Sequence, residues 1–89
     1  MKLKKDFTIY NIADEWMLIP TGEQIATFGG TVVLNEVAAF LVKEIKDDDK
    51  TIDQLMEALL NEYDVDATTA RNDISEALET LKQSGVLED

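Results

Sequence analysis

The chain has 89 residues, of which 45% are hydrophobic, and it contains neither cysteine nor histidine. This length fits one domain with a single modest core, and the composition is that of a folded globular protein. Without cysteine and histidine there are no disulfides, no thiolate or imidazole metal sites and no imidazole general base. We therefore expect a protein that is not an enzyme and that holds no metal or other cofactor.

Nearly all of the net charge of −11 lies in the second part of the chain. Residues 1–34 carry three lysines against four acids, whereas residues 35–89 carry five basic against fifteen acidic side chains. Such a field repels nucleic acid and anionic membranes, and it favours a basic peptide or a basic patch on a partner. Solvated helix faces explain the same acids equally well. With no apolar run typical of a signal peptide or a membrane helix, the expected location is cytoplasmic.

The first third of the sequence predicts three short β-strands. They cover residues 7–12, 16–19 and 24–28, and the first two form a hairpin. Pro20 and Gly22 predict a turn after the second strand, and Gly29 and Gly30 are expected to end the third. The result is an antiparallel meander whose first and third strands are edges.

The second strand is apolar on both faces of this sheet. Trp16 and Leu18 point to one face, and Met17 and Ile19 point to the other. One face packs on helices, and the apolar second face leaves a homodimer open as a further prediction.

The remaining two thirds predict three helices, with N-caps at Asn35, Thr51 and Asp66. Thr51 and Gln54 form a capping box, and Gly85 supplies the stop of the last helix. Val86 and Leu87 are expected to pack back on the core. The predicted fold class is α+β and winged-helix-like, with a three-stranded antiparallel β-sheet followed by a three-helix bundle.

Two kinds of functional site that suit a small acidic protein do not match the sequence. The acidic stretches that begin at Asp47 and Asp64 both lack the glycine that a calcium-binding loop requires at its sixth position. Acyl carriers bear their prosthetic group on a serine in an Asp-Ser-Leu sequence, which is absent here. Capping and solvation account for these acids.

The main alternative function is a winged-helix regulator that binds DNA, with the hairpin as its wing. The last predicted helix would then be the recognition helix. It holds Arg71 and Lys82 against Asp73, Glu76 and Glu79, whereas phosphate contact requires a surplus of basic side chains. The charge therefore argues against nucleic acid as a partner.

Small residues on the last helix favour a binding groove instead. Ala70 and Ala77 leave room between this helix and the edge of the sheet. A peptide in that groove pairs with the third strand and places alternate side chains on Ile74 or Leu78. As in most such stripes, the apolar residues of this helix are first of all core.

Four short stretches follow one another in a distinctive order. They are residues 16–20 (Trp-Met-Leu-Ile-Pro), residues 34–39 (Leu-Asn-Glu-Val-Ala-Ala), residues 63–66 (Tyr-Asp-Val-Asp), and Asp73-Ile74 followed by Gly85-Val86-Leu87. In order and spacing they resemble the family of pyrroloquinoline quinone synthesis protein D (PqqD), described as the recognition element for precursors of ribosomally made, modified peptides. The resemblance extends over most of the chain.

The resemblance implies a peptide-binding adaptor. Members of this family are similar to winged-helix domains and bind the leader segment of a precursor peptide as an added strand between the third strand and the third helix. They present the peptide to a modifying enzyme, which is often a radical S-adenosylmethionine protein. The implied pairing edge is Ile25, Ala26, Thr27 and Phe28, and the implied facing residues are Arg71, Ile74, Ala77 and Leu78. Asp73 matches the family's recurrent acid, and we favour a role in fixing the start of the third helix over a contact with the peptide.

Overall fold

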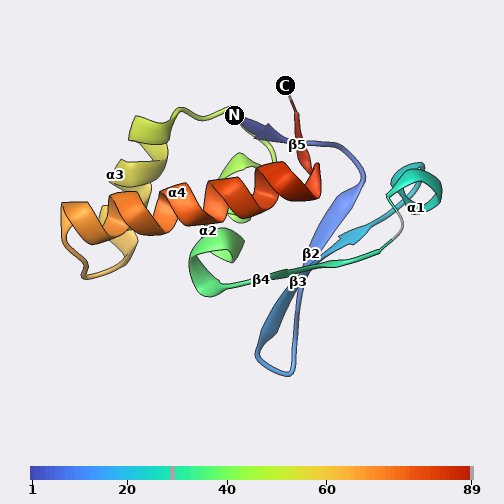
Figure 1. The fold of residues 1–89 in the computed structure, drawn as a ribbon, viewed down its shortest axis with the longest axis horizontal. Helices are drawn as coiled ribbons and strands as arrows, with labels where there is room; N and C mark the ends of the chain where they lie inside the picture. The colour runs from blue at the N-terminus through green and yellow to red at the C-terminus, as the bar shows by residue number, and fades with distance from the viewer. Residues whose placement is uncertain (29, 89) are drawn as a thin grey trace.

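The computed structural model describes residues 1–28 and 30–88, and residues 7–34 include the strands of a three-stranded antiparallel sheet (Figure 1). Strands β2 (Phe7–Ile12), β3 (Glu15–Pro20) and β4 (Val32–Leu34) lie in the order β2-β3-β4, with β3 in the centre. Ala13 and Asp14 join β2 to β3 and both have positive φ angles, as a two-residue hairpin turn requires. The predicted hairpin and meander are confirmed.

The third strand lies later in the chain than the sequence predicted. Residues of the expected strand form the short helix α1 (Gln24–Thr27), in which the Phe28 amide donates to the Gln24 carbonyl at 2.8 Å. A turn of the chain at Gly22, where φ is 51°, leads directly into this helix. The strand β4 begins instead at Val32, where two β-branched residues follow one another. Gly29, predicted to end the strand, lies outside the described residues.

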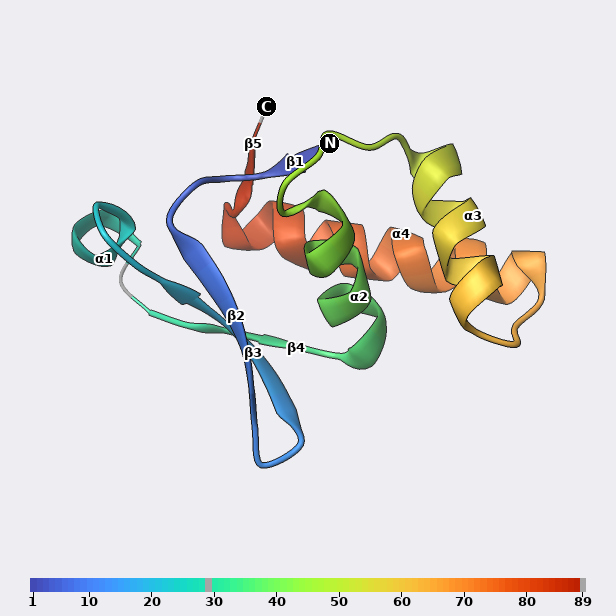
Figure 2. The ribbon, with the colours of Figure 1, turned by 180° about the vertical axis from the view of Figure 1, so that it is seen from behind.

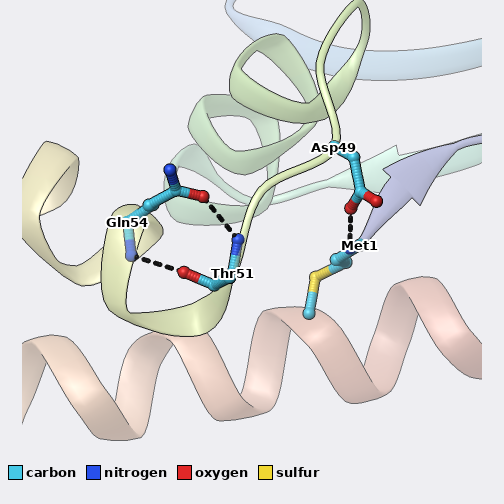
Figure 3. Close-up of polar contacts among 4 residues, drawn as sticks. All are labelled: Met1, Asp49, Thr51 and Gln54. Carbon is cyan, nitrogen blue, oxygen red and sulfur yellow. Dashed lines mark hydrogen bonds and ion pairs between the residues drawn. The ribbon is translucent and has the colours of Figure 1, made fainter.

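Three helices follow, and their starts are the predicted ones. Helices α2 (Glu36–Ile45), α3 (Ile52–Glu62) and α4 (Ala67–Ser84) are capped by Asn35, Thr51 and Asp66. The Asn35 side chain accepts from the Ala38 amide at 2.8 Å, and Figure 3 shows the reciprocal capping box of Thr51 and Gln54. Because each cap satisfies backbone donors that the first turn leaves free, these helix starts are specified locally. Gly85, with φ of 77°, ends α4 as predicted.

The two ends of the described chain pair with each other, which the sequence did not predict. Strand β1 (Lys2–Leu3) lies antiparallel to β5 (Leu87–Glu88). The Met1 ammonium binds the carboxylate of Asp49, as Figure 3 shows. The Lys50 amide donates to the Met1 carbonyl at 2.9 Å. This second sheet closes the side of the helical layer opposite β4 (Figures 1 and 2).

The core lies between the inner face of the sheet and the three long helices. It includes Leu18 of β3 and the apolar faces of α2, α3 and α4, and it contains no buried polar side chain among the described residues. Val86 is fully buried and Leu87 packs against the core, as predicted. In residues 1–28 and 30–88, no helix has the length and apolar character that crossing a bilayer requires. The core therefore fixes α2 and α4 relative to β4.

Candidate functional site

Strand β4 has one paired edge and one free edge. Within the described residues it pairs only with β3, through Leu34 opposite Trp16, Val33 opposite Met17 and Val32 opposite Leu18. A free strand edge presents backbone donors and acceptors that another strand can pair with. This edge is therefore the first element of the candidate site.

The register decides which backbone groups of β4 are free. In a two-residue hairpin the residues that flank the turn, Ile12 and Glu15, form a hydrogen-bonded pair, and such pairs alternate along the ladder. Trp16 therefore points its backbone groups away from β2 and toward β4, where it meets Leu34. On β4, the backbone groups of Leu34 point toward β3, and those of the preceding residue point the other way. The N–H and C=O groups of Val33 therefore point to the free edge.

A hollow of about 230 Å³ lies where β4 ends and α2 begins. It is lined by Asn35, Glu36 and Val37 on one side and by Asp73 and Glu76 of α4 on the other. Figures 1 and 2 show β4 leading directly into α2, and α4 crossing α2, against which it packs. We call this hollow, together with the free edge of β4, the β4–α4 groove.

Acidic side chains dominate the charge of the β4–α4 groove. Three of the five residues that line its hollow, Glu36, Asp73 and Glu76, are carboxylates, and none is basic. Glu36 and Glu76 are exposed and Asp73 is half-buried. The groove therefore has a negative potential that attracts basic groups on a peptide.

The residues predicted on the last helix divide into three groups. Ile74 and Ala77 are buried in the core, with 1% and 2% of their surfaces exposed. Asp73 lines the groove. Arg71 and Leu78 lie two turns apart on one flank of α4, and because Asp73 is two residues from Arg71, it lies on the opposite flank. Arg71 and Leu78 are not among the residues that line the hollow, and their contact with a bound peptide stays a prediction.

The expected role of Asp73 at the start of the helix is wrong. Asp66 is the N-cap of α4, and its side chain accepts from the Thr69 amide at 2.7 Å. Asp73 lies well inside the helix, on the flank that faces the first turn of α2. Its side chain lines the groove and does not cap the helix.

The predicted pairing edge at residues 25–28 is not a strand. Ile25, Ala26 and Thr27 are exposed on α1, whose backbone groups are directed along the helix. The Phe28 ring packs edge-on against Phe7, with the ring centroids 4.9 Å apart. Figure 1 shows α1 at the end of the sheet where β4 begins, away from the start of α2. The edge beside α4 belongs to β4 instead.

Sequence reasoning missed Val33, Glu36 and Glu76 as groove residues. A signal for the strand was present, because the β-branched pair Val32-Val33 and then Leu34 lead up to the N-cap Asn35. Glu76 follows Asp73 by three residues and so shares its flank of a helix. No local signal places Glu36 beside α4, since that contact depends on how the helices pack.

The described residues offer no site for a metal ion. No three histidine, cysteine, aspartate or glutamate side chains among them are arranged to hold one. What the β4–α4 groove offers a ligand is a free strand edge and negative charge.

Comparison with known proteins identifies the family. The family model described as coenzyme PQQ synthesis protein D (PqqD) matches residues 15–87. The chain belongs to the PqqD family. This match contains β3, β4 and the three long helices, so the whole β4–α4 groove lies in the part shared with the PqqD family. The resemblance noted in the sequence is confirmed.

A solved structure has the same fold as this PqqD-family chain. It is TbiB1 in complex with the TbiA(beta) leader peptide, which is 24% identical and superposes with a TM-score of 0.73. The match covers 99% of this chain and 95% of TbiB1. No curated protein matches the chain. The predicted fold class, α+β with a three-stranded antiparallel sheet and a three-helix bundle, is confirmed.

Proposed function

We propose that this protein is a non-catalytic adaptor that binds the leader segment of a ribosomally synthesised precursor peptide in the β4–α4 groove. The observation that carries the proposal is the free edge of β4 beside a hollow that α4 closes. Membership of the PqqD family and a fold shared with a protein that binds a leader peptide support the same function.

In this proposal the leader peptide pairs with β4 as a fourth strand. The N–H and C=O of Val33 supply the central pair of main-chain hydrogen bonds, which give affinity without reading the peptide sequence. Alternate side chains of the added strand point to the inner face, toward α2 and α4. Glu36, Asp73 and Glu76 favour a basic side chain there, so the groove itself supplies the selectivity.

The adaptor then presents the bound peptide to a separate modifying enzyme, for which the family resemblance favours the radical S-adenosylmethionine type. A chain without histidine and cysteine lacks the residues that most often perform catalysis, so the chemistry belongs to that partner. Such an adaptor acts in the cytoplasm. The apolar outer face of the sheet, where Tyr10 and Val33 are half exposed, keeps a homodimer as a prediction.

Two proline substitutions in β4 test this function. Val33→Pro removes the backbone donor at the free edge and leaves the ladder with β3 intact, so we expect the leader-peptide affinity to fall about tenfold or more. Val32→Pro removes a donor to β3 instead and should lower the melting temperature far more. The measurement is calorimetric titration with the leader peptide of the neighbouring precursor, beside thermal unfolding of both variants.

The DNA-binding alternative makes a different prediction in the same assay. Strand addition relies mainly on backbone hydrogen bonds, so raising the salt should weaken it only modestly by screening the groove's carboxylates. Binding to DNA weakens steeply with salt because it releases counterions. Unchanged peptide affinity in a folded Val33→Pro variant would rule out pairing along β4.

A further inference from the structure

A second hollow, of about 290 Å³, lies on the outward side of α2. We call it the aromatic hollow. Its walls combine three aromatic side chains with three carboxylates: Trp16, Phe40 and Tyr63, and Glu36, Glu44 and Glu62. Aromatic faces beside carboxylates form a setting in which proteins bind organic cations.

The aromatic hollow is separate from the β4–α4 groove. Glu36, Phe40 and Lys43 recur at helical spacing on the side of α2 opposite the buried Leu41 and Ile45. Of the residues that line the aromatic hollow, only Glu36 also lines the groove. A strand added to β4 therefore leaves the outward side of α2 free for a second contact.

Packing holds the aromatic walls in place. The rings of Phe40 and Tyr63 meet edge to face, with centroids 5.6 Å apart and an interplanar angle of 79°. Trp16 belongs to the central strand β3 and is half-buried. Phe40 belongs to α2, and Tyr63 is the residue that caps the end of α3. Because each ring is held by a different element, the hollow exists before any ligand arrives, which lowers the entropic cost of binding.

The hollow already binds a cation within the chain. The Lys43 ammonium lies 3.8 Å from the centroid of the Trp16 ring, a geometry typical of cation–π contacts. Glu44 forms an ion pair with Lys50 at 3.5 Å, whereas Glu36 and Glu62 take part in no ion pair among the described residues. Three carboxylates thus line the hollow against one basic side chain, Lys43, and the hollow keeps a net negative charge.

The pKa of Tyr63 agrees with a negative potential in the aromatic hollow. Its pKa is raised above its ordinary value by burial first, and then by the negative charges of Glu36 and Glu62. Both causes disfavour a phenolate in the hollow, and the second also favours a cation there.

We propose that the aromatic hollow is a docking site for a basic segment of a second protein partner, which inserts a lysine or arginine side chain beside the rings of Trp16 and Tyr63. Glu62, which lines the aromatic hollow and not the groove, neutralises the incoming charge, and the rings cover the alkyl stem of the inserted side chain. Charge complementarity selects the occupant, because a hollow lined by unpaired carboxylates repels an acidic segment. The adaptor thus holds its leader peptide at β4 and meets the second protein on the outward side of α2.

A short cationic peptide serves as the probe. Trp16 is the only tryptophan of the chain, so its fluorescence reports directly on the hollow. Titration with acetyl-Gly-Arg-Gly-Arg-Gly-amide should change this fluorescence in a saturable way. The same peptide with citrulline in place of arginine has a similar shape without charge and should leave the fluorescence unchanged.

Three single variants localise the binding. Glu62→Gln should weaken it about threefold or more, which is the contribution expected of one charge contact at a partly exposed site. Glu79→Gln changes the net charge equally but lies on α4 outside the hollow, and it should bind as the parent does. Lys43→Met removes the internal cation over Trp16 and should strengthen binding.

Three outcomes would overturn the proposal. Equal weakening by Glu62→Gln and Glu79→Gln would show that overall charge attracts the probe. Equal binding of the citrulline peptide would show that no cation is recognised. Displacement of the probe by the leader peptide would make the hollow part of the leader site and leave no room there for a second partner.

Discussion

β3 and β4 are neighbours in one sheet, yet they have opposite surroundings. β3 is paired along both edges, and its Leu18 is fully buried under the helices. β4 is paired along one edge, and its Val33 keeps 58% of its surface exposed. The same sheet thus separates two tasks, because the central strand stabilises the fold while the edge strand keeps hydrogen-bonding groups available for a partner.

The largest expected effect contrasts these two strands directly. Leu18→Ala removes a fully buried side chain and should lower the free energy of unfolding by about 2–5 kcal/mol. Val33→Ala, on the exposed face of β4, should change it by less than about 0.5 kcal/mol. Urea unfolding of both variants measures the difference. Similar losses in the two strands would mean that β4 contributes to the core as much as β3 does.

A smaller effect is expected at the junction where β4 becomes α2. Asn35→Ala removes the acceptor of the Ala38 amide and should cost about 1 kcal/mol of stability. Asn35→Asp, which keeps a capping oxygen, is the matched control and should retain nearly all of the stability. Because Asn35 also lines the β4–α4 groove, the alanine variant should bind the leader peptide more weakly only if the junction shifts. Thermal unfolding and peptide titration on the same samples separate the two effects.

The smallest expected effect on stability concerns Asp66, the N-cap of α4. Hydrogen bonds from the Thr69 backbone lower the pKa of this carboxyl below its ordinary value. A lowered pKa in the folded state means that the charged cap stabilises the protein above the ordinary aspartate pKa of about 3.9. That stability is lost as the pH falls through the lowered value.

The matched variant for this prediction is Asp66→Asn, which keeps a capping oxygen without a titrating group. Its free energy of unfolding should differ from that of the parent above the ordinary aspartate pKa, and the difference should shift as the pH falls through the folded value. Urea unfolding at a series of acidic pH values provides the measurement. A difference that stays constant with pH would show that the carboxyl charge adds nothing to the cap.

The elements predicted correctly are those that neighbouring residues specify. The capping box of Thr51 and Gln54, the caps Asn35 and Asp66, and the stop at Gly85 all act within a few residues of the helix end. The β2–β3 hairpin likewise depends on a two-residue turn between apolar strands.

The errors concern segments whose conformation depends on distant contacts. Residues 24–27 and residues 32–34 are both short and apolar in part, but only the second segment has a partner strand across Met17. The pairing of β1 with β5 joins the two ends of the chain, which no local pattern can indicate. On α4 the sequence correctly placed a stripe of core residues, but it could not tell which flank faces β4.

The sequence by itself determined the fold class, the family, the helix starts and the absence of the commonest catalytic side chains, because composition, caps and periodicity are local properties. Only the tertiary structure decided that the free edge is β4, and that Asp73 and Glu76 line the hollow where β4 leads into α2. It also decided that Trp16, Phe40 and Tyr63 form one hollow. These are contacts between elements far apart in the chain, and their geometry follows from how the buried faces of the helices pack on the sheet.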